Sequence, residues 1–151
     1  MKLRMQQSAL AVGVSLLVLS MCAASARARS CSESILNGDY GFTVTGQILT
    51  GSGAGPVTGV AMTHFDGQGN LQQVDHVVHN GVLPAVEWRS GTGTYTVNDD
   101  CTGAAVINFS DHSPSLNLRF VIAKRGSEIR TVVSNPNTAI TSIGIRRETF
   151  F

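Results

Sequence analysis

The sequence predicts an all-β fold: a small antiparallel barrel of about eight strands with one disulfide, a β-sandwich being the alternative. Three observations predict it. Short stretches alternate apolar and polar side chains, glycine- and asparagine-rich turns separate these stretches, and two of the three cysteines lie 70 residues apart. Beyond the first 28 residues, no window keeps the apolar period of a helix.

The N-terminal segment has the layout of an export signal. Lys2 and Arg4 form a short basic head, residues 9–18 form an apolar run, and small residues follow up to Ala28. The run is shorter than the roughly 20 apolar residues that span a bilayer. We therefore expect residues 1–28 to be removed, which leaves one domain, residues 29–151, in the periplasm or outside the cell.

Charge and cysteine usage narrow the class of protein. Removal of Lys2, Arg4 and Arg27 leaves eight of the eleven basic residues against ten acidic ones, all scattered along the chain. This balance lacks the basic stripe of a nucleic-acid-binding protein. Cys31 and Cys101 remain after cleavage, and their wide spacing favours a structural bridge over a reactive C-x-x-C thiol site.

The predicted strands follow one another along the mature chain. Alternation is clearest at residues 40–48 and 115–122, where apolar side chains point one way and polar ones the other. The other β-rich segments are 57–65, 71–79, 91–97, 104–109, 129–133 and 139–145. Consecutive hairpin-linked strands of this number can close into a barrel, which removes the exposed sheet edges.

Turn residues separate these segments. Residues 66–70, Asp-Gly-Gln-Gly-Asn, supply glycines for positive φ and predict a tight hairpin with Phe65 opposite Leu71. A calcium loop would need more carboxylates and flanking helices. Further turns are expected at residues 98–100, 124–126 and 135–137, and a glycine-rich loop at 51–55. Glycines within the strands suit strongly bent barrel strands, at Gly41, Gly46, Gly59, Gly91 and Gly93.

Several of these segments resemble a known group of proteins. Residues 36–42 (Leu-Asn-Gly-Asp-Tyr-Gly-Phe), 65–70, 93–97 and 100–103 resemble a group of uncharacterised exported bacterial proteins. That group in turn looks like the allene-oxide-cyclase-type barrel, a calycin-like relative of the lipocalin-like barrels. The resemblance implies a small barrel with a mouth and a lumen. Its motifs are turns, bends and a cysteine, so no catalytic residue carries over.

The histidines provide the first candidate ligand-binding groups. A tight hairpin at residues 66–70 places His64 and His76 on one face of the sheet. Asp75 and His79 then lie on the other face. Because residues three apart on a strand point to opposite faces, His76 and His79 predict no metal site. Either face could line a barrel mouth, where a histidine exchanges protons near neutral pH; exposed histidines are the alternative.

Glu87, Trp88 and Arg89 form the only cluster of acid, large aromatic residue and base. Trp88, the sole tryptophan, either stacks on a ligand or serves as a core residue or plug. Arg119 either points into a lumen to meet an anion or is solvated outside. The candidate ligand-binding residues are His64, His76, Asp75, Trp88 and Arg119. The sequence names no catalytic residue, cofactor or metal.

The predicted architecture and the lack of a catalytic constellation favour an exported barrel that binds a small apolar or amphipathic molecule. One alternative is a cofactor-free isomerase or cyclase of the allene-oxide-cyclase type, acting through preorganisation and water exclusion. The other is a structural or protein-interaction barrel at the cell surface. We expect no nucleic-acid partner and no membrane insertion after signal removal. A barrel packed solid with leucine and phenylalanine would rule out both small-molecule functions.

Overall fold

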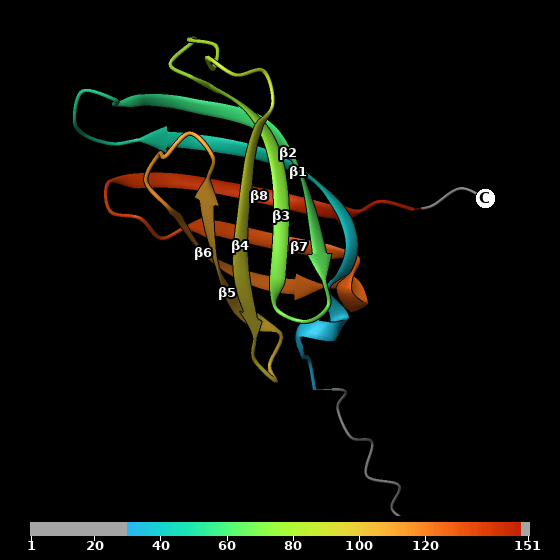
Figure 1. The fold of residues 1–151 in the computed structure, drawn as a ribbon. Helices are drawn as coiled ribbons and strands as arrows, with labels where there is room; N and C mark the ends of the chain where they lie inside the picture. The colour runs from blue at the N-terminus through green and yellow to red at the C-terminus, as the bar shows by residue number, and fades with distance from the viewer. Residues whose placement is uncertain (1–29, 149–151) are drawn as a thin grey trace, which may run out of the picture.

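Eight antiparallel strands close into a barrel in the computed structural model, which describes residues 30–148 (Figure 1). Each strand pairs with the next, and the last pairs with the first. In chain order the strands are β1 (Asn37–Ile48), β2 (Gly55–Asp66), β3 (Asn70–His79), β4 (Arg89–Val97), β5 (Thr102–Phe109), β6 (Leu116–Ala123), β7 (Glu128–Val133) and β8 (Thr138–Arg146). The predicted barrel is confirmed and the sandwich alternative is wrong. The expected signal segment, residues 1–28, lies outside the described residues.

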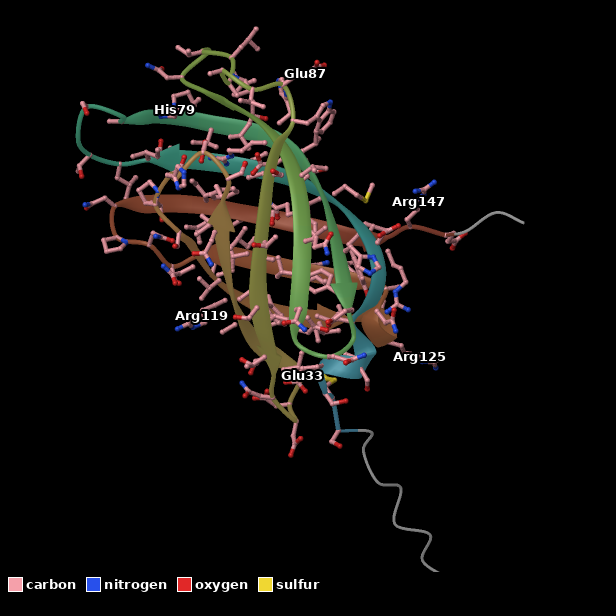
Figure 2. The ribbon with its side chains drawn as sticks, in the orientation of Figure 1. Glu33, His79, Glu87, Arg119, Arg125 and Arg147 are labelled. Carbon is pink, nitrogen blue, oxygen red and sulfur yellow. A yellow bond between two sulfur atoms is a disulfide. The ribbon has the colours of Figure 1, made fainter. Side chains whose placement is uncertain are left out.

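The two ends of the barrel differ. A short 3-10 helix, η1 (Glu33–Ile35), precedes β1 at one end, where a second one, η2 (Lys124–Gly126), connects β6 to β7. The other end carries the long connection between β3 and β4. Figure 2 shows Glu33 at the end covered by η1 and His79 and Glu87 at the opposite end. We call these the closed end and the open end.

The predicted β2–β3 hairpin is confirmed in its register. Phe65 pairs with Leu71 across the turn. The Asp66 carboxylate accepts hydrogen bonds from the backbone N–H groups of Gln68 at 2.7 Å and Asn70 at 3.0 Å. A hydrogen bond from the side-chain amide of Asn70, together with these two backbone bonds, lowers the pKa of Asp66 below its usual value. The carboxylate therefore holds the turn.

Strand glycines let neighbouring strands approach closely in this tightly coiled barrel. A Cβ atom at Gly93 would lie 1.9 Å from the carbonyl oxygen of Val106, and one at Gly46 would lie 2.1 Å from that of Ala139. Both distances are far below van der Waals contact, so any side chain there would push the paired strands apart.

Aromatic residues pack the closed end. The rings of Tyr40 and Phe65 meet edge to face at 5.3 Å, and those of Phe65 and Tyr95 at 5.0 Å. Such pairs add to the stabilisation from burial alone. The Tyr95 hydroxyl lies 3.0 Å from the carbonyl oxygen of Leu36, which is fully buried below η1. Tyr95 thus fastens η1 over the barrel end.

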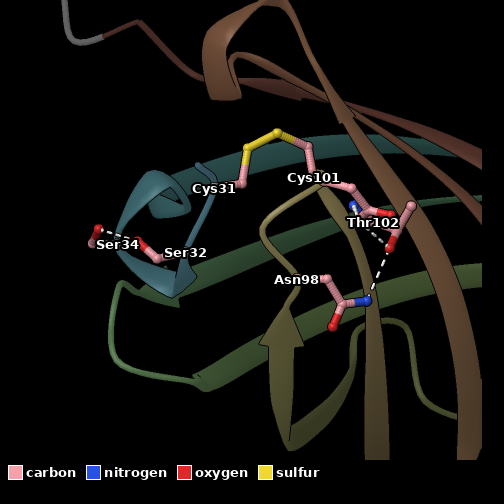
Figure 3. Close-up of a disulfide and its surroundings, with 7 residues drawn as sticks. Cys31, Ser32, Ser34, Asn98, Cys101 and Thr102 are labelled. Carbon is pink, nitrogen blue, oxygen red and sulfur yellow. Dashed lines mark hydrogen bonds between the residues drawn. A yellow bond between two sulfur atoms is a disulfide. The ribbon is translucent and has the colours of Figure 1, made fainter. Parts of the chain in front are cut away.

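The predicted disulfide joins Cys31 to Cys101 beside η1, with Cα atoms 5.0 Å apart (Figure 3). Cys31 also donates its backbone N–H to the carbonyl oxygen of Asp99 at 3.1 Å. In Figure 3, Asn98 donates to the hydroxyl of Thr102 in the turn that carries Cys101. The bridge therefore ties the segment before β1 to the β4–β5 turn. Within residues 30–148, no helix has the length and apolar character needed to cross a membrane.

Candidate functional site

The barrel encloses a cavity of about 270 Å³. All eight strands contribute side chains to its wall, and most of these are aliphatic or aromatic. Representative apolar wall residues are Phe42, Ala61, Ala105, Leu118 and Ile140. The interior is therefore not packed solid, which was the arrangement that would have ruled out a small-molecule function.

Side-chain size explains where the space lies. An eight-stranded barrel is just wide enough for its inward side chains to fill it or to hold one small ligand. Large aromatic rings fill the closed end, whereas inward positions of β2 and β5 carry the small residues Ala61 and Ala105, which pair with Phe42 and Tyr95. A smaller apolar cluster forms beyond them, from Val57, Val133 and Ile140. The cavity lies where the short side chains leave the lumen unfilled.

A chain of hydrogen-bonded polar side chains crosses this mainly apolar wall, which also carries Thr131, Thr141 and Ser142. The Thr63 hydroxyl donates to the Gln73 side-chain oxygen at 3.1 Å. The Gln73 amide in turn donates to the Asp75 carboxylate at 3.2 Å. Thr63 and Asp75 are both buried, the latter only 4% exposed. Buried polar groups are stable only when hydrogen-bonded, and this chain meets that condition.

Arg89 completes the chain through a two-point contact with Asp75. Its Nε and Nη2 atoms donate to the two carboxylate oxygens at 3.0 and 2.9 Å. The guanidinium carbon lies 3.6 Å above the centre of the Phe109 ring, so one face of the cation stacks on an aromatic wall residue. The pair faces each other because Asp75 of β3 and Arg89 of β4 are register partners.

A second carboxylate stands near this pair at the open end. Asp111 Oδ2 lies 3.7 Å from Arg89 Nη1. Asp111 itself accepts hydrogen bonds from the hydroxyl of Ser113 at 2.6 Å and from its backbone N–H at 3.0 Å. These bonds, with a smaller contribution from Arg89, lower the pKa of Asp111 below its usual value. Asp111 is therefore ionised at neutral pH.

His79 lines the open end of the cavity. Its Nε2 atom is buried and has no hydrogen-bond partner within the described part of the chain. Next to it, the β3–β4 connection exposes four large apolar side chains, those of Val82, Leu83, Val86 and Trp88. The open end thus exposes a group of apolar side chains beside the charged residues Arg89 and Asp111.

Four of the five residues predicted to bind a ligand lie away from the cavity wall. His64 is on the outer face of β2, 54% exposed, with its Nδ1 atom 2.8 Å from Asp39. His76 and Trp88 pack together outside, ring centres 5.9 Å apart, and His76 Nδ1 lies 2.6 Å from the Glu87 carbonyl oxygen.

Arg119, the fourth, is exposed on the outer surface of β6 (Figure 2). Of the five, only Asp75 lines the cavity. Sequence reasoning did not assign Thr63, Gln73 or Arg89 to a site. The β3–β4 register sets Arg89 opposite Asp75, and no turn motif in the sequence specifies that register.

Within residues 30–148, no three His, Cys, Asp or Glu side chains lie close enough together to hold a metal ion. Comparison of the chain with protein-family models, curated proteins and solved structures gives no match. The chemistry of the site therefore follows from its own geometry: a mainly apolar space inside the barrel, with one hydrogen-bonded charge pair in its wall.

Proposed function

We propose that this protein binds a small, mainly apolar molecule inside its barrel. The observation that carries the proposal is the cavity of about 270 Å³ with a mainly apolar wall, in which the buried Asp75 pairs with the partly exposed Arg89. Ligand sites of proteins combine these two features, an apolar lining and a few placed polar groups. At about 30 Å³ for a water-sized group, the space suits a ligand with on the order of ten non-hydrogen atoms.

The energetics of packing support this reading. Unfilled core volume costs about 24 cal/mol per Å³, so a space of 270 Å³ forgoes on the order of 6 kcal/mol of packing. That is a large share of the roughly 5–15 kcal/mol by which domains are stable. An apolar molecule in the cavity restores these contacts, and its binding stabilises the folded state through mass action.

Two substitutions on adjacent residues of β5 test the proposal. Ala105 faces the cavity and Ala104 faces outward. Leucine at position 105 adds three carbon groups and fills roughly a third of the space, at about 30 Å³ each. We expect Ala105→Leu to weaken binding of a small apolar probe such as tetralin at least tenfold in calorimetric titration. Ala104→Leu, the matched control, should bind like the wild type.

The outcomes separate clearly. Loss of tetralin binding in Ala105→Leu alone supports a ligand inside the barrel. Equal binding by Ala105→Leu and the wild type places the ligand elsewhere and contradicts the proposal. No uptake by the wild type of tetralin or of polar derivatives of it also contradicts the proposal. Thermal unfolding of both variants checks that each one folds.

A second candidate function is a cofactor-free isomerase or cyclase in the same cavity. The observation that favours it is the Asp75–Arg89 pair in the wall of a mainly apolar cavity, where oriented charges act strongly on a bound substrate. The likeness to allene-oxide-cyclase-type barrels stays a prediction. Mass spectrometry of molecules that co-purify with the protein distinguishes the two candidates, because a carrier releases its ligand unchanged.

We further propose that the protein is exported after removal of residues 1–28. The disulfide supports an oxidising compartment, because such bridges persist in the periplasm and outside the cell. Sequencing of the mature N-terminus tests this. A chain that begins at Arg29 agrees with the proposal, and an intact N-terminus on the folded protein contradicts it.

A further inference from the structure

We propose that the cavity selects neutral, mainly apolar molecules with a hydrogen-bond acceptor, such as a ketone or lactone carbonyl, over both hydrocarbons and carboxylates. This inference rests on the proposed function, because it names the class of molecule that the same cavity takes. Two features of the wall carry it: the N–H groups that Arg89 still has to offer, and the charges that already surround them.

The Arg89 side chain has donors to spare. A guanidinium carries five N–H groups, and only two hydrogen bonds, both to Asp75, use them within residues 30–148. The Nη1 atom is 3.7 Å from Asp111, beyond hydrogen-bonding distance. Arg89 lines the cavity and its side chain is 24% exposed. Its free N–H groups are therefore within reach of an occupant.

The acceptors of the same network are largely engaged, and Asp75 itself is only 4% exposed. Asp75 accepts two hydrogen bonds from Arg89 and one from Gln73. Gln73 uses its own oxygen to accept from Thr63. A ligand hydroxyl would have to share oxygen atoms that already accept these bonds, whereas a ligand carbonyl meets donors that no other group uses. The network therefore favours a ligand that accepts.

The surrounding charges disfavour an anion. Arg89 contributes one positive charge, and Asp75 and Asp111 contribute two negative ones, both within 3.7 Å of the guanidinium. The local sum is one negative charge before any ligand enters. A carboxylate would add to it in an apolar surrounding, where charges interact more strongly than in water. A neutral carbonyl accepts the hydrogen bond without that repulsion.

Phe109 restricts how the acceptor approaches. Its ring covers one face of the guanidinium at 3.6 Å. The cation cannot turn away from this ring without losing both the stacking contact and the two bonds to Asp75. Its free N–H edges are therefore held in one direction, and a rigid ketone loses little freedom in meeting them.

Three bicyclic probes of similar shape test the selectivity: tetralin, its ketone α-tetralone and its carboxylate. By calorimetric titration of the wild-type protein, we expect α-tetralone to bind about tenfold more tightly than tetralin, the gain of one hydrogen bond to a charged donor. The carboxylate should bind at least tenfold more weakly than α-tetralone. Addition of α-tetralone, but not tetralin, should shift the side-chain N–H NMR signals of Arg89.

A double variant removes the selective group. Arg89→Met with Asp75→Leu replaces the buried pair by apolar side chains of similar volume, a change that proteins often tolerate without loss of stability. We expect this variant to bind tetralin and α-tetralone within about twofold of each other, the one hydrogen bond having been removed. Arg119→Met, which removes an exposed outer arginine, is the control and should keep the wild-type order.

Each outcome decides one point. The expected order in the wild type, with its loss in the double variant, supports the inference. Three results would overturn the inference but not the proposed function: tightest binding of the carboxylate, equal binding of ketone and hydrocarbon, or a preference for the ketone that survives in the double variant. Failure of all three probes to bind the wild type overturns the proposed function instead. The wild-type titrations and NMR shifts decide the matter even if the double variant does not fold.

Discussion

Removal of the disulfide should destabilise the protein by an amount that its loop length sets. The bridge closes a loop of 70 residues between Cys31 and Cys101. In the chain-entropy model such a loop contributes about 4 kcal/mol to the free energy of unfolding. For a domain of this size, 1 kcal/mol corresponds to roughly 3–5 °C in Tm. The double variant Cys31→Ala, Cys101→Ala should therefore unfold roughly 12–20 °C below the wild type.

Differential scanning calorimetry of the wild type, with and without reductant, and of the double variant provides the assay. Reduced wild type and double variant should melt together. The matched control is Ser32→Ala with Asn98→Ala, two exposed neighbours of the bridge (Figure 3); it loses only two exposed side-chain hydrogen bonds and should stay within about 1 kcal/mol of the wild type. A double cysteine variant that melts within about 4 °C of the wild type, or 1 kcal/mol, would refute the reasoning.

Three further predictions concern single side chains. Tyr95→Phe leaves the buried carbonyl oxygen of Leu36 without its 3.0 Å donor, which should cost about 1–2 kcal/mol in urea unfolding. Arg89→Met alone leaves the Asp75 carboxylate buried and unpaired, and it should cost about 3–5 kcal/mol by the same measurement; a smaller loss than in Tyr95→Phe would contradict the pairing. Hydrogen bonds from its lysine and arginine neighbours lower the pKa of Glu128 below 4.5. The stability that this carboxylate contributes is therefore complete above that value and is lost as the pH falls below it. Between about pH 5 and pH 3, the free energy of unfolding in urea should fall less in Glu128→Gln than in the wild type.

The β2–β3 hairpin shows what the sequence could predict. Its turn carries glycines at the two positions with positive φ, Gly67 and Gly69, and a carboxylate that caps the backbone. Such local chemistry fixes the register, and the register then follows for every residue pair along both strands. Strand alternation gave the other strands for the same reason: each depends on residues close together in the chain.

The cavity wall depends on information that the sequence does not hold locally. Both faces of β3 mix polar and apolar residues, with Leu71 and Asp75 inside and Val74 and His76 outside. The alternation of side chains separates the two faces of the strand but does not show which face points into the barrel. The long connection between β3 and β4 also gives no turn signal for register. Arg89 therefore becomes a neighbour of Asp75 only once the barrel is closed.

The distribution of these features along the barrel separates stability from selectivity. The disulfide and the Tyr95 contact to Leu36 lie at the closed end, whereas the Asp75–Arg89 pair lies in the cavity wall near the open end. Sites without shared partners contribute independently. The variant without the disulfide should therefore melt earlier but keep the wild-type preference for α-tetralone over tetralin at a temperature where it is folded. The Arg89→Met, Asp75→Leu variant should lose that preference and keep most of its stability. Loss of both stability and preference in either variant would contradict the assignment of the two properties to separate ends of the barrel.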